Sequence, residues 1–467
     1  MSGTTLGIRT GRRPSRSAAF GALATLAALS LGFAGGPAAP AFAGPEYTTA
    51  PAGKFAFVGG TVHTAAGPPI ENGTVLIDRG RIVAVGAQLS VPPDATVIDC
   101  HGKHVSPGFI SANTVLGLIE VQTIEGSDDT RETGTINPNI RAEVMYNPDS
   151  DVIPVTRING VTSVLVVPGG GAIHGTSALM HLDGWTPEDM TLKAPVALHV
   201  DWPRMRPIHA FFIPQSDEEQ MKARDAALAG IRDAFDDARA YETARTAESG
   251  RGVPRHDDDV KWDAMRRVVR GEVPVFFHAD AAAQIRSILA FVDEQKLAHV
   301  AIVGGRDAWM FADELKARDI AVIVGGTLEM PLRRYEAYDA AYTAPARLAA
   351  AGVRYCIADE GGGFAVANTR NLPYHAAMAA AFGLPRDEAL RAITLYPAQI
   401  LGVGDRLGSL EPGKIADLQI TDGDPLEDAT HCEQVYINGR AIPMESRQTR
   451  LFKKYDARPR GPRARPR

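Results

Sequence analysis

The pattern of hydrophobic and polar positions divides the chain into two β-rich ends and a longer middle. Residues 55–105 contain short β-branched runs separated by glycine turns, and apolar positions on both sides of "DRG" at 78–80 predict a β-hairpin. A similar set of short strands recurs in residues 407–442. Neither set has enough strands to bury its own apolar face, so the two are predicted to complete one β-sandwich.

In the middle, apolar runs of strand length alternate with segments of helical spacing. The runs are "GVTSVLVVPGG", "APVALHVDW", "VPVFFHAD", "HVAIVGG", "DIAVIVGG" and "VRYCIADEGG". Continuously apolar strands joined by amphipathic helices are typical of a parallel sheet. The predicted fold class is therefore α/β, a closed (β/α)8 TIM-like barrel with a small β-sandwich domain built from both ends of the chain. The alternative, an open doubly wound sheet, lacks the GxGxxG motif after an early strand that would favour dinucleotide binding.

An insertion at about residues 203–272 interrupts this alternation. Its apolar spacing predicts two helices, one marked by Leu228, Ile231, Phe235 and Ala238 and the other by Trp262, Met265 and Val269. A long excursion between barrel strands often covers the catalytic mouth, so we expect this role here. The alternative is a solvated helical pair far from the site.

The first residues resemble an export signal. Four arginines at positions 9, 12, 13 and 16 precede an alanine-rich apolar run, and the small residues Ala41 and Ala43 predict cleavage after Ala43. The predicted organisation is a signal peptide at 1–43, β-sandwich segments at 44–105 and 403–445, a barrel at 106–402, and a basic disordered tail at 446–467. The expected location is the periplasm or the outside of the cell.

Composition adds only broad limits to this picture. The 467 residues are 45% hydrophobic and 22% charged, which is ordinary for a globular protein, and the net charge of -6 gives no reason to expect a nucleic-acid partner. A small-molecule substrate is expected, with a second copy of the chain or a paralogous subunit as the other candidate partner. No stable membrane span is expected after cleavage.

Four segments resemble the amidohydrolase superfamily: "SPGFISANTVLG", "FFHAD", "IADEGG" and "RLGSLEPGKIADLQITDGDPLE". They are similar to those of the imidazolonepropionase-like and dihydroorotase-like members, which are metal-dependent hydrolases acting mainly on carbon–nitrogen bonds. The likeness covers nearly the whole chain after the signal peptide. It implies the same architecture, a barrel with a β-sandwich from both ends.

The resemblance implies that His278 and Asp359 are catalytic residues and metal ligands, since they match the family ligands after the fifth and eighth barrel strands. The family carries His-x-His after the first strand, where this chain has Asn113 and Val115, and another histidine after the sixth, where it has Gly304. Valine offers no donor, and an amide oxygen is a poor substitute for imidazole on a transition metal. The ligand set is therefore depleted. The expected cofactor is a divalent metal, zinc first, or none.

Three residues are candidates for substrate binding. Asn113 ends the first barrel strand, and His174 lies in the glycine-rich stretch "GGGAIHGTS" after an apolar strand. Arg370 follows the catalytic strand, where a guanidinium can pair bidentately with a substrate carboxylate. A surface loop histidine and an ion pair at a helix start are the respective alternatives for His174 and Arg370.

Three hypotheses of mechanism stay open. In the first, a single metal polarises water on replacement donors drawn from Asn113, His174, His199, Asp201 and Glu360. In the second, His278 and Asp359 act without metal as an acid–base pair. In the third, the chain is a non-catalytic pseudoenzyme that binds a ligand or assembles with an active paralogue. The predicted function is an exported hydrolase of a carbon–nitrogen bond in a small amide or cyclic amide, and the third hypothesis is its alternative.

Overall fold

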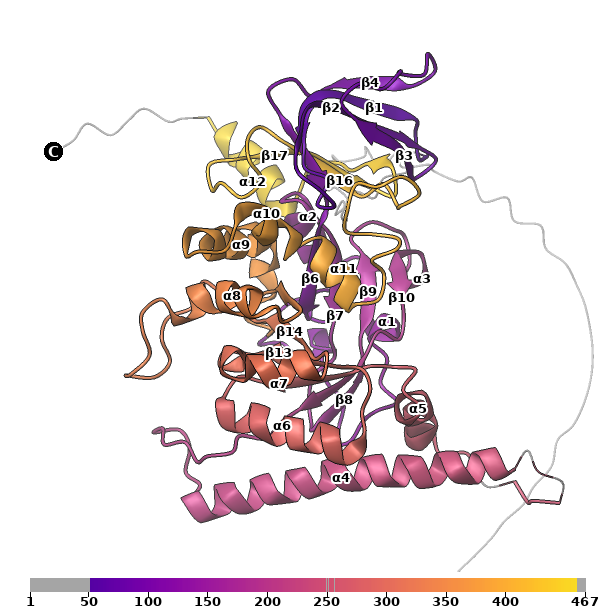
Figure 1. Cartoon of the computed structure of the whole chain (residues 1–467), viewed down its shortest axis with the longest axis vertical. Helices are drawn as coiled ribbons and strands as arrows, with labels where there is room; N and C mark the ends of the chain where they lie inside the picture. Colours follow the sequence, from indigo (N-terminus) through magenta and orange to yellow (C-terminus); the bar gives the residue numbers. More distant parts are fainter. Residues whose placement is uncertain (1–50, 249, 251, 256, 460–467) are drawn as a thin grey trace, which may run out of the picture. The chain divides into compact units, whose positions relative to one another are not determined.

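The computed structural model describes residues 51–459 apart from residues 249, 251 and 256 (Figure 1). These residues belong to the compact unit Gly44–Arg467. The predicted signal peptide at 1–43 lies outside the described residues. Within the described part of the chain, no helix combines the length and the apolar character that crossing a membrane requires.

One sheet contains strands from both ends of the described chain. Its order is β18-β17-β16-β5-β1-β2-β3, with β4 paired to β1. The bounds are β1 Phe55–Val62, β2 Ile70–Asp78, β3 Arg81–Gly86, β4 Thr96–Asp99, β5 His104–Pro107, β16 Leu418–Thr421, β17 Cys432–Ile437 and β18 Arg440–Ala441. Strands β5 and β16 pair antiparallel. This pairing joins segments that are far apart in the sequence.

Local sequence explains the hairpin and the core of this sheet. Arg79 and Gly80, between β2 and β3, have φ of 47° and 78°, the left-handed conformation that a tight two-residue hairpin turn needs. The hairpin predicted at 78–80 is confirmed. Phe57 of β1 and Tyr436 of β17 pack edge to face with ring centroids 4.9 Å apart. Aromatic rings from both ends of the chain therefore share one core.

The segment between these ends forms two further sheets, β10-β9-β7-β6 and β15-β14-β13-β12-β11-β8. The bounds are β6 Phe109–Thr114, β7 Val161–Val166, β8 Ile173–Thr176, β9 Ala178–His181, β10 Thr191–Lys193, β11 Leu198–Asp201, β12 Val275–Ala279, β13 Val300–Gly304, β14 Ala321–Val324 and β15 Tyr355–Ile357. From β11 to β15 every pairing is parallel. The apolar residues of these five strands are buried, as expected for strands covered on both faces.

Helices follow most of the parallel strands. In Figure 1, α6 Ala282–Gln295, α7 Ala312–Ala317, α8 Ala340–Ala351 and α9 Leu372–Ala381 succeed one another along one side of the strands. The shorter helices are α1 Ala142–Met145, α2 Val152–Arg157, α3 Pro187–Met190, α10 Arg386–Arg391 and α11 Leu395–Ile400, and the 3₁₀ turns are η1 Glu125–Ser127, η2 Ala308–Phe311 and η3 Val366–Asn371. The alternation of strand and helix agrees with the α/β class.

The strand pairing of the described residues gives two sheets and not one ring, so the closed barrel stays a prediction. Two features bring the sheets together. Strands β8 and β9 adjoin in sequence but belong to different sheets, and both pair antiparallel with a neighbour. The amides of Ile357 in β15 and Ile110 in β6 donate to the consecutive carbonyls of Ala392 and Ile393. The antiparallel segment departs from the all-parallel order expected, because apolar runs do not encode strand direction.

The insertion forms the two predicted helices, α4 Asp217–Ala247 and α5 Val260–Val269. Ser216 caps α4 by accepting a hydrogen bond from the Glu219 amide, while the Glu219 carboxylate accepts one from the Ser216 amide. Phe235 in the second half of α4 is buried against Phe291 of α6, with ring centroids 5.4 Å apart. The apolar stripe of α4 therefore packs on the body of the fold.

The C-terminal segment corrects a prediction. Residues 446–467 were expected to be a disordered tail, yet Arg447–Asp456 form helix α12. Ser446 accepts a hydrogen bond from the Thr449 amide at 3.3 Å, and this cap starts the helix. The prediction weighed the basic, proline-rich composition and overlooked the cap. Residues 460–467 lie outside the described residues.

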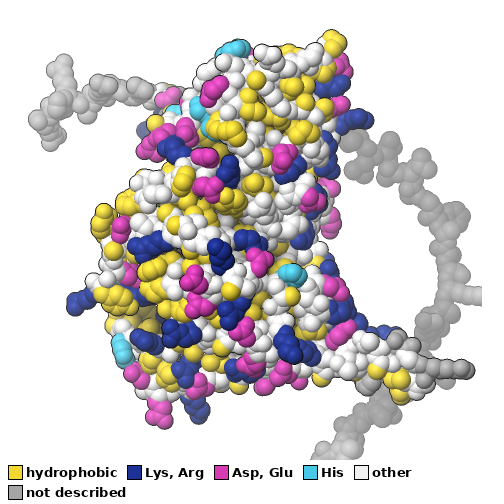
Figure 2. Space-filling view, in the orientation of Figure 1, with side chains coloured by type: hydrophobic (Ala, Val, Ile, Leu, Met, Phe, Trp, Pro, Cys, Tyr) yellow, Lys and Arg dark blue, Asp and Glu magenta, His cyan; other side chains and the backbone are white. Residues whose placement is uncertain are grey.

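Charged side chains of both signs are interspersed on the face shown in Figure 2. Several form surface ion pairs, such as Arg318 with Asp293 at 2.8 Å and Arg232 with Glu294 at 2.8 Å. Exposed pairs of this kind contribute little to stability, about 0 to 1 kcal/mol each. The charges that bear on function lie at the strand ends.

Candidate active site

Four titratable side chains meet where three neighbouring strands end. His199 and Asp201 come from β11, His278 from β12 and His174 from β8. Residues two apart on a strand face the same side, so His199 and Asp201 share a face. Asp201 pairs in register with His278, and β8 flanks β11 on the other side. The sheet order therefore gathers all four groups, which we call the strand-end cluster.

Two histidines of the cluster share a hydrogen bond. His199 Nδ1 lies 2.8 Å from His278 Nε2, and the His199 side chain is fully buried. Burial lowers the pKa of His278 to about 4, although the charge of Asp201 opposes the change. Burial also holds the pKa of His199 well below its usual value, with His278 and His174 adding to the effect. Both rings are neutral at pH 7, and one proton lies between them.

The other two members lie within ion-pair distance of each other. His174 Nε2 lies 3.1 Å from Asp201 Oδ2, while His174 Nδ1 donates to the carbonyl oxygen of Pro168 at 3.1 Å. Burial alone would raise the pKa of Asp201, but the hydrogen bond and charge of His174 outweigh burial and lower it. The Asp201 side chain is 54% exposed. A deprotonated carboxylate therefore stands beside the buried histidine pair.

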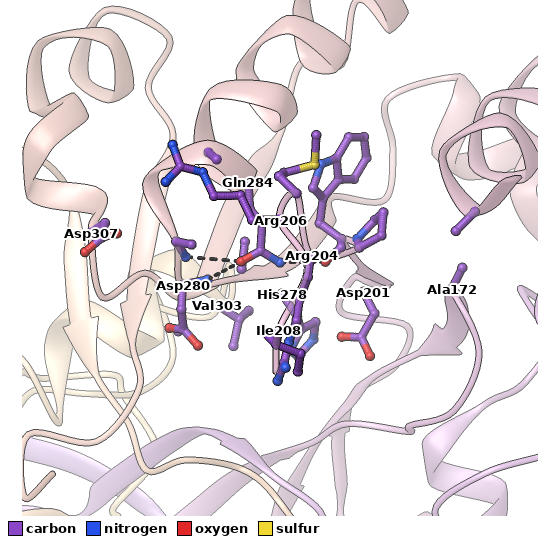
Figure 3. A pocket seen from close by; sticks show the side chains of 18 of the residues that line it. Ala172, Asp201, Arg204, Arg206, Ile208, His278, Asp280, Gln284, Val303 and Asp307 are labelled. Carbon is purple, nitrogen blue, oxygen red and sulfur yellow. Dashed lines mark hydrogen bonds between the residues drawn. The ribbon is translucent and has the colours of Figure 1, made fainter. Parts of the chain in front are cut away.

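The cluster borders a cavity of about 1420 Å³. Asp201 and His278 line it, as do Asn113 and Glu360, and Figure 3 shows the side chains of Asp201 and His278 next to each other. One wall belongs to α4, which contributes the small residues Ala223, Ala226, Ala227 and Gly230. The insertion thus borders the cavity and is not a helical pair far from it. The volume exceeds the range of about 300 to 1000 Å³ that is usual for small-ligand pockets.

Asp359 lies behind the cavity wall. Its side chain is 2% exposed, and burial raises its pKa to about 7 against the hydrogen bonds from Thr369 and the Gly361 amide. Among the described residues, Asp359 Oδ2 has no hydrogen-bond partner. Asn113 Nδ2 donates to the Asp359 carbonyl oxygen at 3.5 Å. Asn113 and Glu360 line the cavity, while Asp359 itself does not.

Arg370 is not among the residues that line the cavity, and its role in substrate binding stays a prediction. Its carbonyl oxygen accepts a hydrogen bond from Asn159 Nδ2 at 2.5 Å. Asn159 directly precedes β7, so this contact is near the amino end of the strands, whereas His278 is near their carboxyl end. The neighbour of Arg370 in η3, Thr369, lies with its hydroxyl 3.0 Å from that of Thr114 at the carboxyl end of β6.

Comparison with known proteins adds three findings. The family model described as "Amidohydrolase family" matches residues 337–442. The amidohydrolase tasK of Hapsidospora irregularis is 26% identical over 406 residues, which span 79% of this chain but only 40% of tasK. The imidazolonepropionase of Mesorhizobium japonicum is 25% identical over 389 residues, which cover 76% of this chain and 87% of that enzyme.

A solved structure extends the likeness to the fold. The crystal structure of an amidohydrolase from Thermotoga maritima superposes with a TM-score of 0.73 and 26% identity, over 84% of this chain and 100% of that chain. The chain belongs to the amidohydrolase superfamily. This agreement supports an α/β fold with a small additional domain.

The superfamily is generally metal-dependent, so we asked whether the donors present suit a metal. At the superfamily's histidine positions this chain has Asn113, Val115 and Gly304, and Val115 is packed in the apolar core. Within the described ranges, no group of three or more His, Cys, Asp or Glu side chains is arranged to hold a metal ion. The members of the strand-end cluster are instead bonded in two pairs. The arrangement does not fit the superfamily's metal centre.

Sequence reasoning identified some of these groups and missed others. It named His278 and His174 for the site, and it named His199 and Asp201 only as replacement metal donors. Their spacing in "HVD" at the end of an apolar run was the usable signal, because period two places both on one face. The cavity residues Arg204, Arg206, Asp280 and Asp307 were missed, since loop charges carry no periodic pattern.

Proposed function

We propose that this protein is an exported hydrolase that cleaves a carbon–nitrogen bond in a small amide or cyclic amide. Superfamily membership and the similarity to enzymes named amidohydrolase and imidazolonepropionase support the reaction class. The observation that carries the proposal is the strand-end cluster, where two proton-exchanging pairs stand side by side at a cavity. The chain spans less than half of tasK, so the substrates of that longer protein are not transferred to it.

In this proposal Asp201 is the general base. Its lowered pKa keeps it deprotonated at neutral pH, and its exposure lets it accept a proton from a water molecule in the cavity. His174 holds the carboxylate in place through the 3.1 Å ion pair. The water that loses its proton then attacks the amide carbon. Positioned acid–base groups contribute about 10²- to 10⁴-fold to a rate.

His278 is the general acid, and His199 sets its protonation. When His199 Nδ1 donates to His278 Nε2, the second nitrogen of His278, Nδ1, carries a hydrogen that it can give to the leaving nitrogen. After this transfer, the proton that Asp201 took from the water returns to His278 Nδ1. The overall step then consumes one water molecule and leaves the side chains of Asp201, His278 and His199 as they began.

Asp359 is the second proton-exchanging group of the proposal. A buried carboxyl with a pKa of about 7 gains and loses its proton near neutral pH. Asn113, which bonds to the Asp359 backbone and lines the cavity, is placed to hold the substrate carbonyl. The closed barrel and the export by residues 1–43 also belong to this proposal.

The test is an assay of purified protein against a panel of linear and cyclic amides, measuring released ammonia or amine. We expect hydrolysis of at least one member, a loss of about 10²-fold or more in His278→Asn, and retained activity in the presence of a chelator. His101→Ala is the matched control, because this histidine is exposed beside Asp99 in the terminal sheet. Equal activity of His278→Asn and wild type would overturn the assigned roles.

The alternative is a non-catalytic subunit on the same scaffold. The three lost histidine positions favour it. In that case no amide is cleaved, and the protein forms a stable complex with a second copy or with a paralogue that keeps the superfamily's histidines. Light scattering of the protein, alone and mixed with such a paralogue, measures this directly.

A further inference from the structure

Two arginines that line the cavity beside the strand-end cluster have no ionic partner among the described residues. Arg204 and Arg206 lie in the segment that leads from β11 to α4, and both are labelled in Figure 3. Among the residues that the structure describes, no side chain forms a hydrogen bond or ion pair with either guanidinium. Arg333, the third arginine lining the cavity, differs because it pairs with Asp307 through two contacts of 3.0 and 2.9 Å.

The segment that carries the two arginines is fixed at both ends. Trp202 donates its amide to the His278 carbonyl at 3.1 Å, and its own carbonyl accepts from Gln284 Nε2 at 2.7 Å. Ile208 exchanges two backbone hydrogen bonds, of 3.0 and 3.1 Å, with the side chain of Gln220 in α4. Prolines at 203 and 207 stiffen the backbone between these anchors. The guanidiniums therefore extend from a held segment next to the reacting groups.

The other charges of the cavity do not neutralise them. Asp201 is engaged by His174, and Asp307 is engaged by Arg333. Asp280 accepts a hydrogen bond from the Arg306 amide, and burial raises its pKa. Three of the four carboxylates that line the cavity therefore contact other groups, and Glu360 is the fourth. Two positive charges remain for a ligand that enters this part of the cavity.

We propose that Arg204 and Arg206 bind a carboxylate on the amide substrate, so that the protein prefers N-acyl amino acids and related acidic amides. This inference rests on the proposed function and deepens it. Guanidinium matches carboxylate geometry bidentately, and the small residues of α4 leave room beside it for an aliphatic or aromatic body. A singly charged carboxylate suits the place better than a dianionic phosphate, because Asp201 is close by and repels the second charge.

The test compares matched pairs, each an N-acyl amino acid and its uncharged amide. In wild type we expect the acid to bind about 10- to 100-fold more tightly, the range for hydrogen bonds to charged groups. The double variant Arg204→Gln/Arg206→Gln should lose this preference through a raised KM with little change in kcat. Its behaviour toward the uncharged member should not change. Arg232→Gln on the outer part of α4, where Arg232 pairs with Glu294, is the matched control.

Titration calorimetry separates this inference from the proposed function. Preferential binding of the acids without hydrolysis would support the carboxylate site and contradict the hydrolase function. Hydrolysis without preference for the acids would support the hydrolase function and contradict the carboxylate site. A phosphonate analogue that binds more tightly than the carboxylate would overturn the carboxylate assignment. Equal binding of charged and uncharged members, or preference retained in the double variant, would overturn the arginine site.

Discussion

Strands β6 and β11 both end at the cavity, and each presents side chains two positions apart on one face. At the end of β6 these are Asn113 and Val115, of which one donates to a backbone carbonyl and the other is packed in the apolar core. At the end of β11 they are His199 and Asp201, both tied to other ionisable groups. The same backbone geometry thus carries side chains that do not titrate at one strand and titratable side chains at the other. Strand position alone does not assign chemistry.

The largest expected effect comes from substituting one side chain at the end of each strand. Asp201→Asn removes the proposed base and should lower kcat/KM by about 10²- to 10⁴-fold. Asn113→Ala should lower it by about 10-fold, the effect of one neutral hydrogen bond. Asp293→Asn, exposed on α6, is the control. Similar losses at the two strand ends would show that β6 contributes as much chemistry as β11.

A second prediction concerns the apolar packing at β6. Val115→His places a polar ring in the core that surrounds Val115, which is 7% exposed, and should lower the free energy of unfolding by about 3 kcal/mol. Asp201→Asn should change it by less than about 1 kcal/mol, since that side chain is half exposed. Urea denaturation measures both. A stable Val115→His variant that gains tightly bound zinc would contradict this account of β6.

The third prediction uses pH, because burial shifts the pKa values of His278 and Asp359 in opposite directions. His278 has a folded pKa of about 4 against 6.5 for the free ring, so between these values the unfolded chain binds the extra proton and stability rises with pH. Asp359 has a folded pKa of about 7 against 3.8, so in its window the folded chain binds the extra proton and stability falls as pH rises. These shifts correspond to about 3 kcal/mol for His278 and about 4 kcal/mol for Asp359.

In wild type these contributions largely cancel between about pH 4 and 6.5. His278→Asn should therefore show stability that falls with pH across this window, and Asp359→Asn should show stability that rises. Urea midpoints of the two variants and wild type, measured at several pH values, test the signs. Parallel pH profiles in all three proteins would mean that the burial of one of these groups does not govern its titration.

The features predicted correctly from sequence depend on residues close together in the chain. The hairpin follows from Arg79 and Gly80, and the insertion helices follow from apolar spacing such as that of Ile231 and Phe235. The antiparallel β8 and β9 were not predicted, because period-two patterns read the same in both directions. Helix α12 was missed because a single cap at Ser446 outweighs an unfavourable composition.

The candidate site residues also divide into those that local sequence indicates and those that depend on the folded chain. His278 was found because it ends a recognisable strand, and Asp201 was weighed for its place two residues after His199. The role of Arg370 stays a prediction, since the path of the chain after β15 is set by packing and not by local pattern. Arg204 and Arg206 gave no signal at all, because their meaning depends on which carboxylates in the folded protein are already paired.

Helix α4 has a consequence for how the substrate range of this protein can evolve. Its small residues at 223, 226, 227 and 230 form a wall of the cavity, while its second half is anchored by Phe235. The proton-exchanging groups all lie on strands, or directly after a strand, outside this insertion. Enlarging a single alanine on this wall would narrow the range of accepted ligands and leave the strand ends untouched. The range of substrates and the reaction chemistry therefore depend on different residues, so selection or engineering can alter the first without changing the second.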